Sequence, residues 1–387
     1  MSKKVEIYNA YFGDCIVLKD EDDDSNLLVD FGVHYFSKVA KKYGSRECLL
    51  EEIENGIIKS YSNKNISLLI THFHEDHISG LIHMYKNKKC KNFFRNIYIA
   101  NIWNNPFIVA SNLLEEMLLE NELKKCDLPR TTASLFDLLD FLSDNVQGIK
   151  LLKRGDLFEN DKYITLWPEI DNKENYISEI IQSLELPEEF EGNLLTLANS
   201  ACTFMENILS DNRNYYVNAT QEMRSFYNML FLTFIEHAVN NGQNMQKEKL
   251  NKLNHRYNVV FQNTKCGNEN VLFTGDIDVT QMNEIANAKD IALYKCYKYI
   301  KIPHHGTLKH YFDYSTFNPQ YVIISNGKVN SKNSESYKIC KEYGTLNAIH
   351  LCTNSNNCVN CNLSCFLSES DCAIDRKLIY GKLSRIF

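Results

Sequence analysis

The strongest constraint on this chain comes from residues 71–80, which read Thr-His-Phe-His-Glu-Asp-His-Ile-Ser-Gly and follow a short apolar run. Such a run predicts a buried strand, so the polar residues leave the sheet at the carboxyl end of that strand. His72 and His74 are two residues apart and point to the same side of an extended backbone. Asp76 and His77 fall where a helix begins. Three imidazoles and a carboxylate this close together suit zinc or a similar divalent ion.

Three other predicted strands also end in groups that can bind or orient a metal. An apolar strand over 270–275 delivers Asp276, and a strand that begins at Tyr299 ends in His304 and His305. Earlier in the chain, Asp30 closes a strand over 26–32. A carboxylate there would accept the ring N–H of a histidine ligand and fix its tautomer, although an ordinary turn is an equally good interpretation of Asp30.

The order of the predicted elements indicates an α/β protein whose core is interrupted twice by helical insertions. Strand patterns occupy both ends of the core, whereas the insertions carry Leu, Met and aromatic residues at helical spacing, as in packed helices. The predicted parts are a first half-core (1–106), an insertion (107–146), a core hairpin (147–169), a second insertion or cap (170–252), a second half-core (253–352) and a Cys-rich tail (353–387).

Several local predictions are specific enough to test. Residues 5–32 alternate in the manner of an antiparallel meander of three strands. The runs 149–158 and 162–168 predict a hairpin. Residues 33–60 and 335–343 have helical patterns, and 347–352 predicts a last strand.

The order of these motifs resembles the metallo-β-lactamase-fold hydrolases, and most closely the hydrolase domain of ComEC-type competence proteins and its stand-alone relatives. The resemblance spans about 1–168 and 254–352, and it leaves the insertions and the tail unexplained. It rests on His-x-His-x-Asp-His at 72–77 together with shorter motifs: Gly13-Asp14-Cys15-Ile16, Leu28-Val29-Asp30-Phe31-Gly32, Arg154-Gly155-Asp156, Leu166-Trp167-Pro168, Leu272-Phe273-Thr274-Gly275-Asp276-Ile277 and Lys301-Ile302-Pro303-His304-His305-Gly306.

The resemblance implies an αββα sandwich with two divalent metal ions, Zn or Mn, and assigns their ligands. One ion would be held by His72 and His74 and the other by Asp76 and His77, with Asp276 between them and Asp76 also able to orient the attacking water. His305 matches the last ligand of the family. Residues beside these ligands are candidates for supporting or substrate-binding roles, namely Asp30, His304, His255, Lys309 and His310.

One departure from the family pattern concerns the first ion. Many members carry a further ligand histidine in the middle of the chain, but no histidine lies between His83 and His237 here. The first ion therefore has an open position for water, or it takes a ligand from elsewhere. His255 is a candidate for that ligand.

The implied activity is hydrolysis by water that two metal ions activate, most simply of a phosphodiester in nucleic acid or a small nucleotide. A peptidase, amidase or lactonase would use the same ions, and a non-catalytic module that binds a protein partner through its helical insertions is a further alternative. The formal net charge of −7 argues against a large basic surface for nucleic acid. It therefore favours a short substrate, or a partner protein that supplies the contacts to nucleic acid.

The remaining expectations concern location and cysteines. The most apolar helical stretch, 229–239, is too short to cross a membrane, and no signal segment is visible at the start, so we expect a cytoplasmic protein that does not bind membranes. Near the end, the cysteines could hold a structural zinc or stay reduced in a loop, while disulfides are disfavoured: Cys352, Cys358, Cys361, Cys365 and Cys372.

Overall fold

The computed structural model describes most of the chain: residues 3–35, 44–89, 91–125, 135–145, 148–169, 177–211, 219–237, 243–326, 339–353 and 384–386. Cys352 ends a strand, whereas the other cysteines of the tail lie outside these ranges, so the prediction of a zinc site there is not addressed. The described chain forms two compact units. The first consists of 1–100, 150–168 and 258–387, and the second of 101–149 and 169–257.

The first unit contains two mixed sheets, so the α/β class that the sequence predicts is confirmed. The strands of one sheet lie in the order β14-β1-β2-β3-β4-β5-β6. Neighbours from β14 to β3 are antiparallel, and β3, β4 and β5 are parallel to one another. Their bounds are β1 Lys3–Tyr8, β2 Ile16–Asp20, β3 Ser25–Val29, β4 Asn65–Ile70, β5 Ile97–Ala100, β6 Ile149–Leu152 and β14 Ser384–Ile386.

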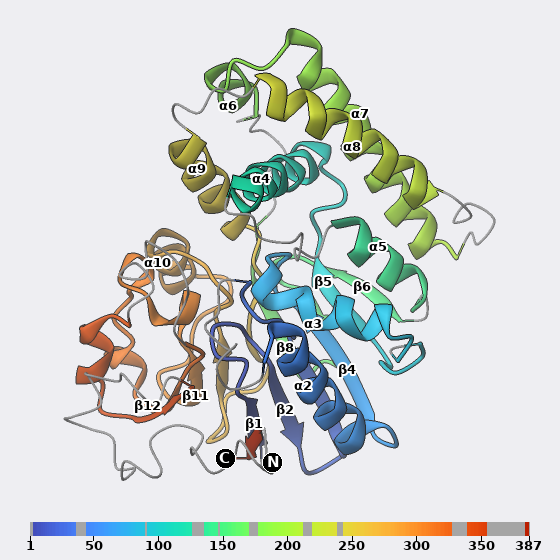
Figure 1. Cartoon of the computed structure of the whole chain (residues 1–387). Helices are drawn as coiled ribbons and strands as arrows, with labels where there is room; N and C mark the ends of the chain where they lie inside the picture. The colour runs from blue at the N-terminus through green and yellow to red at the C-terminus, as the bar shows by residue number, and fades with distance from the viewer. Residues whose placement is uncertain are drawn as a thin grey trace. The chain divides into compact units, whose positions relative to one another are not determined.

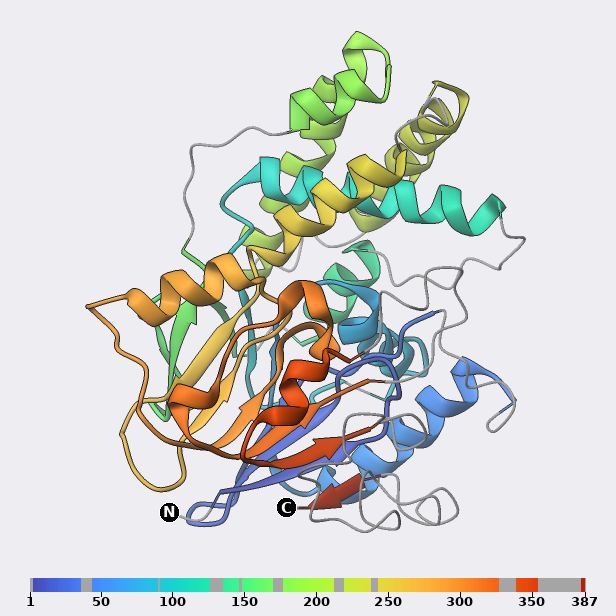
Figure 2. The same cartoon turned by 90° about the vertical axis from the view of Figure 1, so that its left-hand side faces the viewer.

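The second sheet repeats this division between antiparallel and parallel strands. Its order is β13-β12-β11-β10-β9-β8-β7, with parallel pairing from β13 to β10 and antiparallel pairing from β10 to β7. The bounds are β7 Leu157–Phe158, β8 Tyr163–Trp167, β9 Val260–Asn263, β10 Val271–Phe273, β11 Tyr297–Lys301, β12 Pro319–Ile324 and β13 Ile349–Cys352. The blue strands of the first sheet and the yellow to red strands of the second can be followed in Figure 2.

Most predicted strands are present, including the antiparallel meander of β1, β2 and β3. The predicted hairpin of 149–158 and 162–168 is present in its second part, where β7 and β8 pair antiparallel. Its first part is wrong, because β6 belongs to the first sheet and β7 to the second. A break at Lys153–Asp156 separates them, and Gly155 there has a φ of +88°. In the predicted helix 335–343, Ile339 instead forms a β-bridge to Thr307, and a 3₁₀ turn begins at Lys341. Residues 335–338 lie outside the described ranges.

Helices of the first unit bury one apolar face each. They are α2 (Arg46–Tyr61), α3 (Glu75–Lys86) and α10 (Val279–Asn287). α2 packs beside α3, and both are labelled beside the strands of the first sheet in Figure 1. α10 begins with a complete capping box between Asp278 and Gln281. Its buried face joins the core of the second sheet, so the segment that carries Asp276 is anchored on both sides.

The second unit is helical. α4 packs against α7 and α9, and α8 packs against α7 and α5. The bounds are α4 Pro106–Lys125, α5 Leu135–Ser143, α6 Ile177–Ser183, α7 Glu188–Leu209, α8 Ala219–His237 and α9 Gln243–His255. Polar contacts support the apolar packing, since the Ser111 hydroxyl donates to Asn254 Oδ1 at 2.7 Å between α4 and α9. Within the described ranges, no helix has the length and apolar character that crossing a membrane requires.

Candidate metal centre

The candidate ligands follow strands that are neighbours within each sheet. Asp30 comes directly after β3, and the His72 segment comes after the parallel neighbour β4. In the second sheet, Asp276 follows β10, and His304 and His305 follow its parallel neighbour β11. The carboxyl ends of parallel strands lie at one edge of a sheet, which is where open α/β sheets place their sites. Each sheet thus presents two ligand segments at one edge.

The start of α3 is fixed by backbone contacts to two earlier loops. His74 occupies the position before the helix, and Asp76 and His77 lie in its first turn. The carbonyl of Asp76 accepts the Asp14 N–H at 3.0 Å, and the carbonyl of His77 accepts the Phe31 N–H at 2.8 Å. Because both bonds use main-chain atoms, the two side chains start from a rigid base.

Four buried side chains from the two halves of the core converge: Asp76, His77, Asp276 and His305. Each offers a ligand atom, and these atoms all lie within 4.8 Å of one another. His77 Nε2 is 3.2 Å from Asp276 Oδ2, and His305 Nε2 is 3.0 Å from Asp76 Oδ2. Asp276 Oδ2 also lies 3.6 Å from His305 Nε2, which makes it the oxygen shared by both histidines.

The other ring nitrogen of each of these histidines is held by an acceptor outside the cluster. His77 Nδ1 lies 2.8 Å from Asp30 Oδ2, and His305 Nδ1 lies 2.7 Å from the carbonyl oxygen of Ser325. Carboxylates and carbonyls only accept, so both Nδ1 atoms carry the proton. The main-chain N–H and the hydroxyl of Thr71 both donate to Asp30 at 2.7 Å and fix that carboxylate in turn. Both Nε2 atoms are therefore directed into the cluster, the arrangement that metal-binding histidines use.

The imidazoles and carboxylates of the cluster shift one another's pKa. Burial alone would lower the pKa of His77, but the neighbouring carboxylates of Asp276 and Asp30 outweigh it and raise that pKa well above its ordinary value. Burial likewise raises the pKa of Asp276, yet His77 and Lys301 hold it well below its usual range. Both shifts favour charged carboxylates that face protonated imidazoles.

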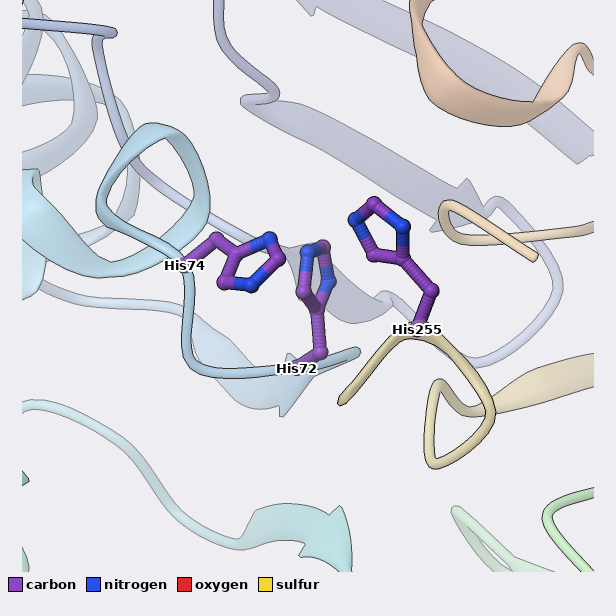
Figure 3. Close-up of side chains that lie close together, drawn as sticks. All are labelled: His72, His74 and His255. Atoms are coloured by element: carbon purple, nitrogen blue, oxygen red, sulfur yellow. The ribbon is translucent and has the colours of Figure 1, made fainter. Parts of the chain in front are cut away.

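His72 and His74 form a second group of nitrogens next to the four-residue cluster. Their rings meet edge to face with centroids 4.6 Å apart, and the centroids of His72 and His77 are 4.0 Å apart. Figure 3 shows the two rings projecting from the loop before α3 and also labels His255. His255 is the last residue of α9, in the second unit, and is buried.

The segment after His305 carries the remaining predicted residues. His304 and His310 stack with ring centroids 3.9 Å apart, and the Nδ1 atom of each lies close to the hydroxyl oxygen of Thr307, at 2.9 and 3.1 Å. Burial lowers the pKa of His310 to about 4, so this imidazole is neutral at pH 7. Lys309 is exposed in the same turn. This segment supplies polar groups beside the cluster rather than within it.

Three residues beside the cluster received no role from the sequence: Asn258, Lys301 and Asp14. Asn258 Oδ1 accepts the Asp276 N–H at 2.9 Å, and Lys301 Nζ lies 2.6 Å from Asp14 Oδ2. Lys301 is the last residue of β11, after the buried Tyr299 and Ile300. A buried charge needs a partner, so the position of Lys301 after apolar residues could have indicated that it has an acceptor, although not which one.

The donor set of the site fits divalent ions such as zinc or manganese. Imidazole nitrogens suit zinc and carboxylate oxygens suit manganese, and buried groups from distant parts of the chain hold both kinds in place. The sequence of the chain matches no protein-family model, and comparison with curated proteins likewise gives no match. The geometry of the site is therefore what supports a functional assignment.

Proposed function

We propose that this chain is a metal-dependent hydrolase of the metallo-β-lactamase fold with a dinuclear site. The observation that carries this proposal is the buried convergence of Asp76, His77, Asp276 and His305 from two sheets. Two bound divalent ions would supply a Lewis acid and a water of lowered pKa for attack on the substrate. The pairing of two seven-stranded mixed sheets in the first unit supports the αββα sandwich.

In this proposal the ligands divide into two groups that share one carboxylate. Asp76, His77 and His305 would hold one ion, and His72 and His74 the other. Asp276 would lie between them, since its Oδ2 faces both His77 and His305. Asp30 and Ser325 would keep the His77 and His305 rings in the tautomer that binds metal.

We propose His255 as the third nitrogen ligand of the ion at His72 and His74. The support is the short length of chain that joins His255 to a residue bonded to the His72 segment. The Val259 N–H donates to the Thr71 carbonyl at 2.9 Å, directly before His72. Only three residues separate His255 from Val259, and the four steps along the chain span at most about 14 Å. This short connection would allow the His255 imidazole to reach the His72 segment, where it would take the place of the mid-chain histidine that the sequence lacks.

The proposed substrate is a phosphodiester, in nucleic acid or a small nucleotide. Two divalent cations attract the anionic oxygens of phosphate. The exposed Lys309 and the hydrogen-bonding groups of His304 and His310 lie in the segment around His305. The formal net charge of −7 favours a short substrate, or one delivered by a partner. The second unit, whose helix α8 exposes Met229 and Leu232, is the proposed surface for such a protein partner.

Metal analysis of the purified chain tests the proposal most directly. We expect about two ions per chain, the stoichiometry of a two-metal site, and their loss together with activity in Asp276→Ala. Asp20→Ala is the matched control, because Asp20 is also buried and its Oδ2 lies 3.0 Å from Lys162 Nζ, as part of a different ion pair. It should lose stability but keep both ions. A wild-type chain that binds no ion would refute the proposal.

The substrate class is tested separately, with wild-type protein loaded with Mn or Zn. Linear and circular DNA, RNA, cyclic dinucleotides and chromogenic phosphodiesters are incubated with the enzyme, with peptides and lactones alongside. We expect turnover of at least one phosphodiester, and its loss in Asp276→Ala. Turnover of a peptide or lactone alone would refute the phosphodiester assignment and leave the metal site intact.

A further inference from the structure

Lys301 is a buried cation beside the candidate metal centre. It ends β11, and its side chain is 2% exposed. Its Nζ atom lies 2.6 Å from Asp14 Oδ2 and 3.3 Å from Asp276 Oδ1, and it donates to the carbonyl of Gly275 at 3.3 Å. An ammonium group is removed from water at a high cost unless such partners surround it, so these contacts fix its place.

The contacts of Lys301 join the two halves of the core. Asp14 lies in the loop between β1 and β2 of the first sheet, and its main chain contacts Asp76 and Gly32 at 3.0 Å each. Asp276 and Lys301 belong to the second sheet. The ammonium group therefore ties the loop that supports the start of α3 to the segment that carries Asp276.

The two oxygens of Asp276 have different neighbours. Oδ1 accepts from Lys301 Nζ and, at 3.1 Å, from the main-chain N–H of His304. Oδ2 faces His77 Nε2 and His305 Nε2. With Oδ1 occupied by two donors, only Oδ2 is presented to the ligand cluster.

We propose that Lys301 is a positioning residue that makes Asp276 bind metal ions through Oδ2 alone. This inference rests on the proposed dinuclear site and adds a residue to it. The charge of Lys301 does not itself favour metal binding, since like charges repel. Its contribution is orientation, and the adjoining Asp14 carboxylate balances its charge.

A double variant separates orientation from charge. Lys301→Met with Asp14→Asn removes one positive and one negative charge at similar side-chain size. The matched control, Lys162→Met with Asp20→Asn, removes another Lys–Asp pair of the same unit, whose Nζ and Oδ2 atoms are 3.0 Å apart. Metal affinity is measured by competition with a chromogenic chelator, and folding by thermal unfolding. We expect affinity to fall about 10–100-fold in the first double variant, as for other groups that orient ligands, and to stay unchanged in the control.

The electron paramagnetic resonance spectrum of the Mn²⁺-loaded protein gives a second readout. Two Mn²⁺ ions that share one oxygen of Asp276 are spin-coupled, so the wild type should give a coupled spectrum and the Lys301→Met/Asp14→Asn variant should give separate ions. The single variant Asp14→Asn keeps Lys301 and its contacts with Asp276 Oδ1 and the Gly275 carbonyl, and the asparagine oxygen can still accept from Lys301 Nζ. It should therefore keep the coupling even where the double variant does not fold.

Three results would overturn the role of Lys301. The first is wild-type affinity in the Lys301→Met/Asp14→Asn variant, and the second is an equal loss of affinity in the control pair. The third is loss of coupling in Asp14→Asn, which would reduce Lys301 to a partner of Asp14. A wild-type chain without ions would instead refute the proposed function itself, and the role of Lys301 with it.

Discussion

Replacement of Gly32 by alanine should displace the main chain that carries the candidate ligands Asp76 and His77. A Cβ atom on Gly32 would lie 2.3 Å from the carbonyl carbon of Asp76 and 2.4 Å from the main-chain nitrogen of His77. Both neighbours are main-chain atoms at the start of α3, so no side-chain rotation can relieve the overlap. The loop and the helix would have to separate by about 1 Å to restore ordinary van der Waals distances.

Gly267→Ala is the matched control for the size of this effect. A Cβ atom on Gly267 would have no neighbour within 4 Å, and Gly267 belongs to the same unit as Gly32. Overpacking costs about 1–3 kcal/mol, and the rigid neighbours of Gly32 favour the upper end. Alanine at an unstrained open glycine instead stabilises by about 0.4–1 kcal/mol. The two variants should therefore differ by roughly 2–4 kcal/mol in the free energy of unfolding.

Urea unfolding of the two variants, followed by metal analysis, measures this difference. Gly32→Ala should unfold at lower urea concentration and bind metal more weakly, because the displaced main chain carries Asp76 and His77. Gly267→Ala should unfold at equal or higher urea concentration and bind metal normally. Equal midpoints for Gly32→Ala and wild type would refute the close approach of the loop to α3.

Two further predictions concern the edge of the core and the first ion. Burial lowers the pKa of Lys3 to about 8 from 10.5, so the unfolded chain binds more protons between these values and stability rises with pH there. Lys3→Met should be more stable than wild type at pH 7 and should lack this rise in urea titrations from pH 7.5 to 10.5; an unchanged rise would contradict the assignment. His255→Ala should lose one of the two ions by elemental analysis, whereas His237→Ala, also at the end of a helix of the second unit and exposed, should keep both. Two ions in His255→Ala would exclude it as a ligand.

The sequence predicted the positions of the candidate ligands after strands better than the contacts among them. Apolar runs that end in His72 or Asp276 are local signals, and the structure has strands β4 and β10 directly before these residues. Sheet membership is not local, because it depends on which strand edge a segment meets. For this reason, the run 149–158 was predicted as one arm of a hairpin. Its side-chain pattern does not show the break between β6 and β7, after which the chain joins the other sheet.

The partners of Lys301 could not be identified from the sequence for a related reason. Asp14 lies in a loop between strands of the first sheet and Lys301 ends a strand of the second, and no spacing rule connects them. A sequence can indicate that a buried lysine requires an acceptor, but identifying that acceptor among the many carboxylates of the chain requires the fold. The same limit applies to Ser325, whose contact with His305 uses a main-chain carbonyl that any residue would provide.

Backbone strain at the site carries information that residue types do not. Asp30, His304 and His305 have φ values of +55°, +44° and +56°, in a region that side chains other than glycine seldom occupy. Such residues cost about 1–3 kcal/mol each and persist where surrounding contacts over-determine them. The contacts that oppose this cost at Asp30 are the two donors of Thr71 and the ring of His77, and at His304 and His305 they are Asp276, Thr307 and Ser325. These same contacts direct Oδ2 of Asp276 and the two Nε2 atoms toward one point, so the backbone strain at these three residues accompanies the geometry of the candidate ligands.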